Sequence, residues 1–231
     1  MAIAVHQQPA IALLHGVGIE IGAFNHPFPL SPGAQVSYLD VITPQRAKEL
    51  FPEIDPAGLV QVDRIIDLDG DGLGYLGDHA LDFVIMSHVI EHLANPVRAI
   101  KEAFRVLAIG GRLMIVVPDR DFTFDRLRAT TSFEHLWDDY VNGVTASSDA
   151  HYLDYLKSAG PHHLSEPTER LVATLRWARE RREHSHVWTS DSFRDFFIRV
   201  VSSLGYQAEP AYESLSADNK FEYFGVWTRL H

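Results

Sequence analysis

The chain has 231 residues, of which 46% are hydrophobic, and a formal net charge of -11. This length can bury one large core and requires no second domain, so we expect a single domain over residues 1–231. The negative charge excludes nucleic acid and anionic membranes as expected partners, and the absence of cysteine excludes disulfides and thiol chemistry.

The first half of the chain alternates short apolar runs with helical patterns, which is typical of βαβ units in a mostly parallel sheet. We expect strands at residues 18–21, 35–39, 64–68, 81–86 and 112–117. Thr43-Pro44 marks the start of a helix after the second strand. Asn95-Pro96 starts another after the fourth, and we expect the pair Gly110-Gly111 to end it.

The alternation stops between residues 119 and 187, which we interpret as a helical insertion on the substrate side. Thr189-Ser190 then caps a helix with one apolar stripe, which Gly205 ends. Residues 206–212 and 221–228 are predicted as an antiparallel strand pair. The pattern as a whole predicts an α/β fold, a Rossmann-like doubly wound sheet of seven mostly parallel strands with this pair at its C-terminal end.

The first strand carries Glu20 and leads into Gly22. Ligands of open α/β sheets bind beyond the carboxyl ends of the strands, at the point where the strand order reverses, so a nucleotide is expected here. Asp40 closes the second strand at nearly the spacing of a ribose-binding acid. Two alternatives remain open, an ordinary glycine turn at Gly22 and helix capping by Asp40 near Thr43.

Residues 81–96, LDFVIMSHVIEHLANP, resemble the fourth-strand signature of class I S-adenosylmethionine-dependent methyltransferases, and the resemblance extends from residue 16 to residue 118. It implies S-adenosylmethionine as cofactor. The residues it assigns to the cofactor are Glu20, Gly22 and Ala23 for the methionine moiety, Asp40 for the ribose, Asp69 and Gly70 for the adenine, and Ser87 and His88 for the sulfonium.

Three local features qualify this resemblance. Phe24 stands where the commonest first motif has a second glycine, so the loop approaches the cofactor differently or leans on Asn25. Residues 67–72, DLDGDG, also match the opening of a calcium loop, although the twelfth position holds Asp78 instead of Glu. The pair Glu91-His92 lies on the turn after a buried strand, where we expect it to organise the fold.

The insertion is rich in histidine. It contains six of the chain's thirteen histidines: His135, His151, His162, His163, His184 and His186. A hydroxyl acceptor must lose a proton, and histidine is the usual base near neutral pH. We predict His151 as the catalytic base, because Asp149 and Tyr152 could orient its ring, and His135 as the second candidate; a structural role remains the alternative for each.

A metal is a further alternative. His184 and His186 would point the same way on a strand, as two metal ligands do. The version that we would test is Mg²⁺ bridging a diol to Asp119 or Asp121, because magnesium prefers oxygen ligands.

The insertion also resembles that of small bacterial sugar O-methyltransferases, of the mycobacterial methylmannoside 1-O-methyltransferase type. The residues that carry this similarity are Asp125, Arg128, His135, Tyr140, His151, Tyr152, His184, His186, Val187 and Trp188. It implies a carbohydrate hydroxyl as acceptor. A catalytically silent S-adenosylmethionine-binding partner subunit and a nicotinamide-dependent oxidoreductase are the competing hypotheses.

The remaining expectations concern the location of the protein in the cell and its partners. The chain start lacks the pattern of a secretory signal, and no run approaches the roughly 20 apolar residues that span a bilayer. We therefore expect a cytoplasmic protein whose partner is a small hydroxylated acceptor, with a homodimer left open.

Overall fold

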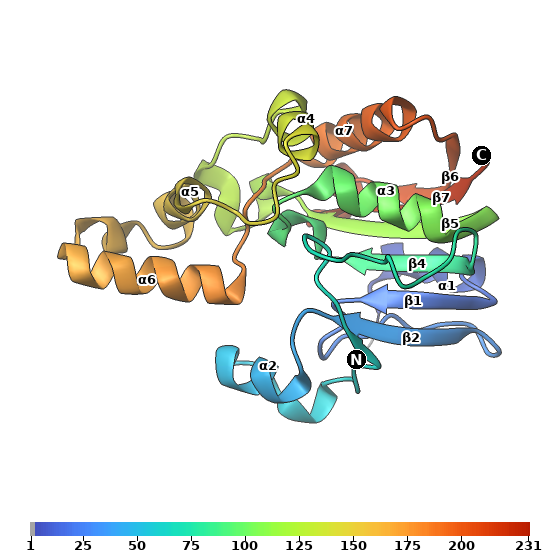
Figure 1. Cartoon of the computed structure of the whole chain (residues 1–231), viewed down its shortest axis with the longest axis horizontal. Coiled ribbons are helices and arrows are strands. Elements are labelled where there is room, and N and C mark those ends of the chain that lie inside the picture. The colour runs from blue at the N-terminus through green and yellow to red at the C-terminus, as the bar shows by residue number, and fades with distance from the viewer. Residues whose placement is uncertain (1–2) are drawn as a thin grey trace.

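The computed structural model describes residues 3–231, which form a seven-stranded sheet of order β3-β2-β1-β4-β5-β7-β6 (Figure 1). The strands are β1 Val17–Ile21, β2 Gln35–Asp40, β3 Arg64–Ile65, β4 Leu81–Ser87, β5 Leu107–Pro118, β6 Ala208–Ser214 and β7 Glu222–Arg229. The pairs among β1 to β5 are parallel, whereas β7 pairs antiparallel with both β5 and β6. The predicted fold class is confirmed.

Three of the helices begin where the sequence places their caps. Thr43 Oγ1 accepts the backbone N–H of Arg46, and Asn95 Oδ1 accepts that of Arg98. The helices are α1 Gln8–Leu13, α2 Pro44–Leu50, α3 Pro96–Val106, α4 Phe133–Val141, α5 Asp149–Ala159, α6 Thr168–Arg181, α7 Ser190–Ser203 and α8 Ser216–Asn219. Short 3-10 helices link them: η1 Val5–Gln7, η2 Pro56–Gly58, η3 Ile90–His92, η4 Arg120–Phe122, η5 Phe124–Leu127 and η6 Pro161–Ser165.

Two expected boundaries are wrong. Helix α3 ends at Val106, and Gly110 lies inside β5 with a φ of 82°, next to a shift of the pairing register with β4. A β-bulge of this kind uses glycine for its left-handed backbone. The third strand ends at Ile65 because a turn begins two residues later, where Asp67 Oδ1 accepts the N–H of Asp69.

Both faces of the sheet are covered. Phe83 and Ile85 of β4 belong to a core with α1, while the alternating Val84 and Met86 face the larger core formed with α3 and α7. The predicted apolar stripe of α7, from Phe193 to Val201, lies in this larger core. Because strand β1 pairs with both β2 and β4, the strand order reverses between β1 and β4, as in doubly wound folds.

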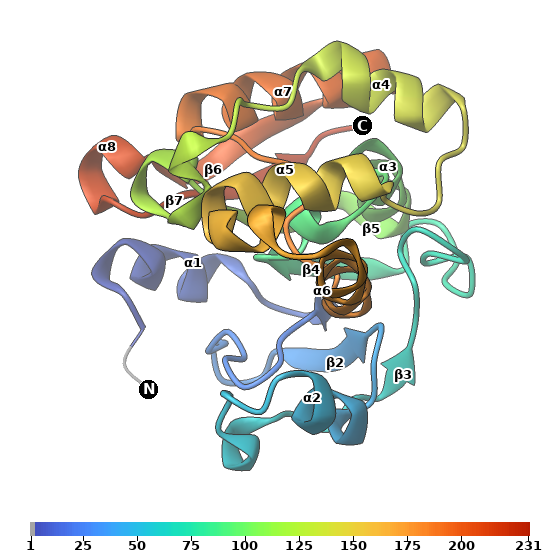
Figure 2. The ribbon, with the colours of Figure 1, turned by 90° about the vertical axis from the view of Figure 1, so that its left-hand side faces the viewer.

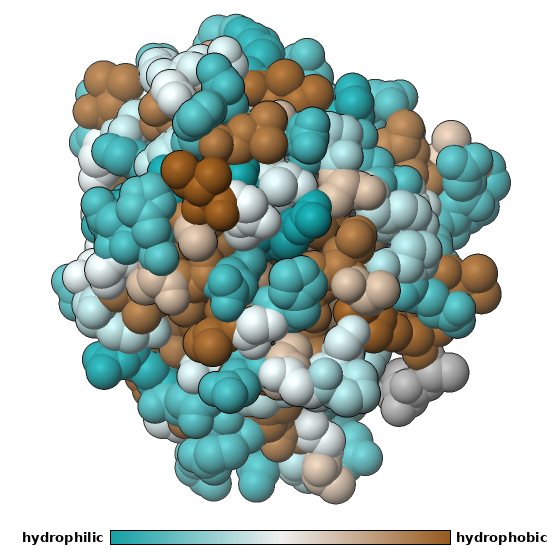
Figure 3. Space-filling model, turned by 90° about the vertical axis from the view of Figure 1, so that its right-hand side faces the viewer, coloured by the Kyte–Doolittle hydropathy of each residue, from teal (hydrophilic) through white to brown (hydrophobic). Residues whose placement is uncertain are grey.

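The segment 119–187 holds η4, η5, α4, α5, η6 and α6. Helices α5 and α6 lie beyond the carboxyl ends of β1 and β4 (Figure 1), and in Figure 2 they stand in front of the sheet. At the opposite end, where these strands begin, hydrophobic and hydrophilic residues are interspersed over the surface (Figure 3). Within residues 3–231, no helix combines the length and the apolar character needed to cross a membrane.

Candidate active site

A cavity of about 670 Å³ lies at the carboxyl ends of β1, β2 and β4. Six of the residues expected to bind the cofactor line it: Glu20, Gly22, Ala23, Asp40, Ser87 and His88. The segment after β4 adds His92, and the end of α6 adds Arg181 and Arg182. The cavity therefore lies at the reversal of strand order, where doubly wound sheets bind their ligands.

Two buried carboxylates give the cavity its charge. Both oxygens of Glu20 lie within hydrogen-bond distance of the backbone N–H of Phe28, at 2.9 and 3.1 Å. Burial raises the pKa of Glu20 to about 7, although this hydrogen bond opposes the shift. Burial also raises the pKa of Asp40, whose carboxylate accepts the N–H of Ile42. Both acids would gain from a cationic or hydrogen-bond-donating ligand.

The loop between β1 and β2 has an unusual backbone. Gly22 has a φ of 68°, and a Cβ there would lie 2.8 Å from a methyl group of Val89. Phe24 also has a positive φ, 49°, and its ring packs edge-on against Phe51. Phe24 and Asn25 both line the cavity, so the departure from the usual motif places an aromatic side chain at the wall of the site.

Asp69 and Gly70, which the resemblance assigned to the adenine, do not line the cavity. The carboxylate of Asp69 is turned inward, where it accepts the N–H groups of Ala94 and Asn95 at 3.0 and 2.9 Å. Ile66 and Leu68 of the same segment line the cavity instead. Asp67 is paired with Arg182, so two of the three carboxylates in the DLDGDG segment are already engaged.

His88 is held between two buried carboxylates. Its Nε2 lies 2.8 Å from Glu222, and its Nδ1 lies 3.5 Å from Glu91. Burial by itself would lower the pKa of His88, but the two carboxylates outweigh it and raise the pKa to about 10. His88 is therefore protonated at neutral pH and cannot accept a proton there.

His92 has the opposite electrostatic character. Its Nδ1 lies 2.6 Å from the carbonyl oxygen of Arg182. Because a carbonyl oxygen only accepts, Nδ1 carries the proton and the neutral ring keeps its electron pair on Nε2. Burial, and then the neighbouring His184, lower the pKa of His92. His92 is thus the cavity histidine that has the protonation state of a general base at neutral pH.

The sequence analysis assigned the pair Glu91-His92 to fold organisation, and it did not expect His92 at the cavity. Glu91 has such a role, because its carbonyl oxygen accepts the N–H groups of Ser185 and His186. The sequence signal that could have placed His92 at the cavity was its position, because η3 begins shortly after the carboxyl end of β4.

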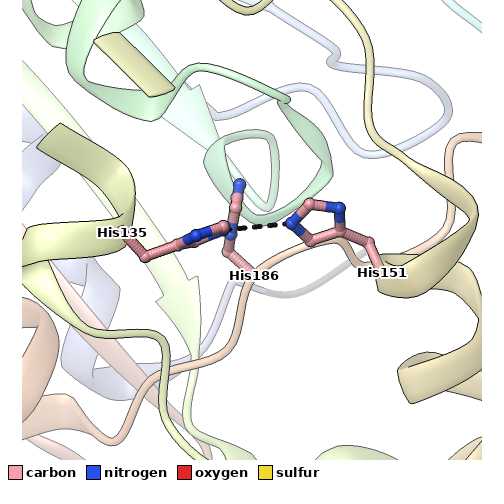
Figure 4. Close-up of side chains that lie close together, drawn as sticks. All are labelled: His135, His151 and His186. Carbon is pink, nitrogen blue, oxygen red and sulfur yellow. Dashed lines mark hydrogen bonds between the residues drawn. The ribbon is translucent and has the colours of Figure 1, made fainter. Parts of the chain in front are cut away.

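His151 and His135, the predicted bases, do not line the cavity. Both lie against His186, and the Nε2 atoms of His135 and His151 are 3.1 Å apart (Figure 4). The residues expected to orient His151 have other roles, since Asp149 pairs with Arg179 and Tyr152 is buried. Ser148 contacts the ring of His151 instead, with its Oγ 3.0 Å from Nδ1.

The expected magnesium ligands are not free to bind a metal together. Asp119 is buried, with one oxygen accepting the N–H of Asp121 and the other accepting the N–H of Ser190 and the hydroxyl of Ser216. Asp121 is exposed and pairs with Arg120. These contacts join the end of β5 to α7 and α8, so Asp119 stabilises the fold.

Asp119→Ala is expected to lower the free energy of unfolding by about 3 kcal/mol, because it leaves the buried N–H of Ser190 without an acceptor. Asp121→Ala is the matched control and should change it by less than about 0.5 kcal/mol, since its side chain is exposed. Urea unfolding of the two variants measures both values. Equal effects would show that Asp119 does not have this role.

The seven-stranded mixed sheet, with a ligand-sized cavity at its reversal point, defines a doubly wound α/β protein of the nucleotide-binding class. The chain belongs to the methyltransferase domain family, whose model matches residues 33–199. The expectation of a methyltransferase is confirmed at this level.

The chain is also similar to individual proteins, one by sequence and two by fold. An uncharacterized protein of Methanocaldococcus jannaschii is 30% identical over 105 residues, which span 46% of this chain and 44% of that protein. A Rhodobacter sphaeroides protein, solved as a candidate Zn-dependent alcohol dehydrogenase, has a TM-score of 0.54 at 13% identity and covers 98% of this chain and 90% of its own. The trans-methyltransferase CalH, solved in complex with SAH, has a TM-score of 0.50 at 17% identity and covers 98% and 56%. At these identities the two structures show a shared fold alone.

Proposed function

We propose that this chain is an S-adenosylmethionine-dependent O-methyltransferase that acts on a hydroxyl of a sugar or a similar small metabolite. The observation that carries the proposal is the cavity at the ends of β1, β2 and β4. It combines two buried carboxylates with a neutral histidine, in a chain that belongs to a methyltransferase family.

The residues of the cavity fit this cofactor. A volume of about 670 Å³ lies within the range of small-molecule sites. Glu20 would complement the positive charges of the methionine moiety, and Asp40 would accept hydrogen bonds from the ribose hydroxyls. Ile66 and Leu68 offer an apolar surface for the adenine, in place of Asp69 and Gly70.

When bound, the cofactor would supply an activated methyl group on its sulfonium, with Glu20 and Asp40 holding the methionine and ribose ends. Most of the acceleration of methyl transfer would come from the walls of the cavity, because they would align the acceptor with the methyl group. His92 Nε2 would take the proton of the hydroxyl, which replaces our first assignment of this role to His151. Protonated His88 would stay paired with Glu91 and Glu222.

Support for a carbohydrate acceptor comes from the similarity of the insertion to sugar O-methyltransferases and from the aromatic wall of the cavity. Phe24, Phe51 and Phe221 line it, and aromatic faces of this kind pack well on the apolar faces of sugar rings.

The proposal is tested by titrating S-adenosylmethionine and NAD into the protein and by following transfer of a labelled methyl group to a panel of mono- and disaccharides. We expect binding of S-adenosylmethionine and labelling of at least one sugar. Binding without turnover on any acceptor would favour the catalytically silent partner subunit. Binding of NAD alone would overturn the cofactor assignment.

The role of Glu20 predicts a pH dependence. Its pKa is about 7 in the folded protein, and the cationic cofactor binds the ionised carboxylate, so protonation on lowering the pH opposes binding. Between pH 8 and pH 6 the affinity of the wild type for S-adenosylmethionine should fall. This fall should be about tenfold larger than that of the Glu20→Gln variant. Calorimetry at the two pH values measures this difference, and the ionisation of the cofactor itself cancels between the two proteins. Parallel pH profiles would rule out contact between Glu20 and the cofactor.

A further inference from the structure

Three histidines from separate segments converge outside the cavity. His135 lies on α4, His151 in the first turn of α5, and His186 in the segment that leads to α7. Each offers one ring nitrogen, and these nitrogens all lie within 4.8 Å of one another. Figure 4 shows the three rings facing a common point.

His186 is the least explained member of this cluster. It is 1% exposed, and neither of its ring nitrogens has a hydrogen-bond partner within residues 3–231. A buried polar group without a partner is unfavourable, so such groups in native proteins usually mark an ion, a water or a functional site. An imidazole nitrogen without a hydrogen-bond partner can give its electron pair to a metal ion.

A carboxylate lies beside one member of the cluster. Asp139 Oδ2 is buried without a hydrogen bond among the described residues, and it lies 3.3 Å from His135 Nε2. The same Nε2 lies 3.1 Å from that of His151. Ligand atoms at 2.0–2.1 Å from a tetrahedral zinc ion are separated by about 3.3 Å, so both spacings match those around one metal ion.

We propose that His135, His151 and His186 bind a Zn²⁺ ion, with Asp139 beside His135. Three imidazole nitrogens, with a fourth position open to water, are a ligand set that zinc accepts in tetrahedral sites. Without a metal, His151 Nδ1 accepts the backbone N–H of Ser148, 3.2 Å away, so Nε2 carries the proton. Metal binding at Nε2 therefore moves the proton to Nδ1, where Ser148 Oγ, 3.0 Å away, can accept it. Since none of the three histidines lines the cavity, the ion ties α4 and α5 to the segment before α7 and takes no part in methyl transfer.

The test uses the full chain, stripped with a chelator and titrated with Zn²⁺ alone against a chromophoric competitor. We expect one tight site per chain and a rise of the melting temperature on zinc binding. His135→Ala and His151→Ala should each weaken the site by roughly 100-fold or more. The matched control is His162→Ala, whose exposed side chain lies in a separate cluster with the half-buried His163 and Glu166, and it should bind zinc as the wild type does.

Zinc X-ray absorption should show only nitrogen and oxygen ligands at about 2.0–2.1 Å. Far-UV circular dichroism of the metal-free variants checks that they fold, and His135 and His151 are chosen because their side chains are less buried than His186. No zinc binding by the folded wild type would overturn the proposal, and so would binding that survives both substitutions. A metal-free hydrogen-bonded histidine cluster would then be the correct description.

Discussion

Replacing His92 by alanine or glutamine is expected to lower kcat by roughly 10²- to 10⁴-fold, the usual contribution of a positioned base. The affinity for S-adenosylmethionine should change little, because the proton is transferred only in the chemical step. Glutamine keeps a hydrogen-bond donor for the carbonyl oxygen of Arg182 but cannot accept a proton. His26→Ala is the control, since His26 also lines the cavity but is exposed.

The pH profile of kcat separates His92 from its neighbour His88. The pKa of His92 is lowered, so a rate that depends on its neutral form should be constant from pH 7 upward and should fall only in acid. The pKa of His88 is about 10, so a rate that depended on its neutral form would climb until about pH 10. A rate that climbs in this way, or full activity of His92→Gln, would refute the assignment of His92.

Asp40→Ala is expected to weaken binding of S-adenosylmethionine by roughly 10²- to 10⁴-fold, since two hydrogen bonds to a charged acceptor are worth about 3–6 kcal/mol together. Calorimetric titration measures this loss. Asp63→Asn is the matched control, because Asp63 also accepts a backbone N–H of β2, that of Tyr38, but does not line the cavity. It should bind the cofactor with the affinity of the wild type.

The unliganded Asp40→Ala protein should remain folded. Burial raises the pKa of Asp40, which means that the ionised carboxylate is less favourable in the folded chain than in water. Its removal relieves this cost but leaves the N–H of Ile42 without its acceptor. The two effects oppose each other, so the melting temperature without cofactor should stay close to that of the wild type. Unchanged cofactor affinity in the folded variant would show that Asp40 caps the turn at Ile42 and does not bind ribose.

The sequence alone determined most of the framework. Helices α2, α3 and α7 begin at the predicted caps, and the predicted antiparallel pair closes the sheet. It also located the cavity, because Glu20 and Asp40 stand at the ends of strands that the fold class brings side by side. Caps, periodicity and strand ends are encoded by neighbours within a few residues, so they can be found without the structure.

Only the tertiary structure decided which candidate for the base lies at the cavity. The carbonyl of Arg182, 90 residues away, fixes the proton of His92 on Nδ1, whereas His135 and His151 meet His186 outside the cavity. Asp69 and Asp119 likewise turn inward to backbone N–H groups from distant segments. A polar side chain is directed by the partners that packing places beside it, and those partners come from parts of the chain whose approach no local pattern encodes.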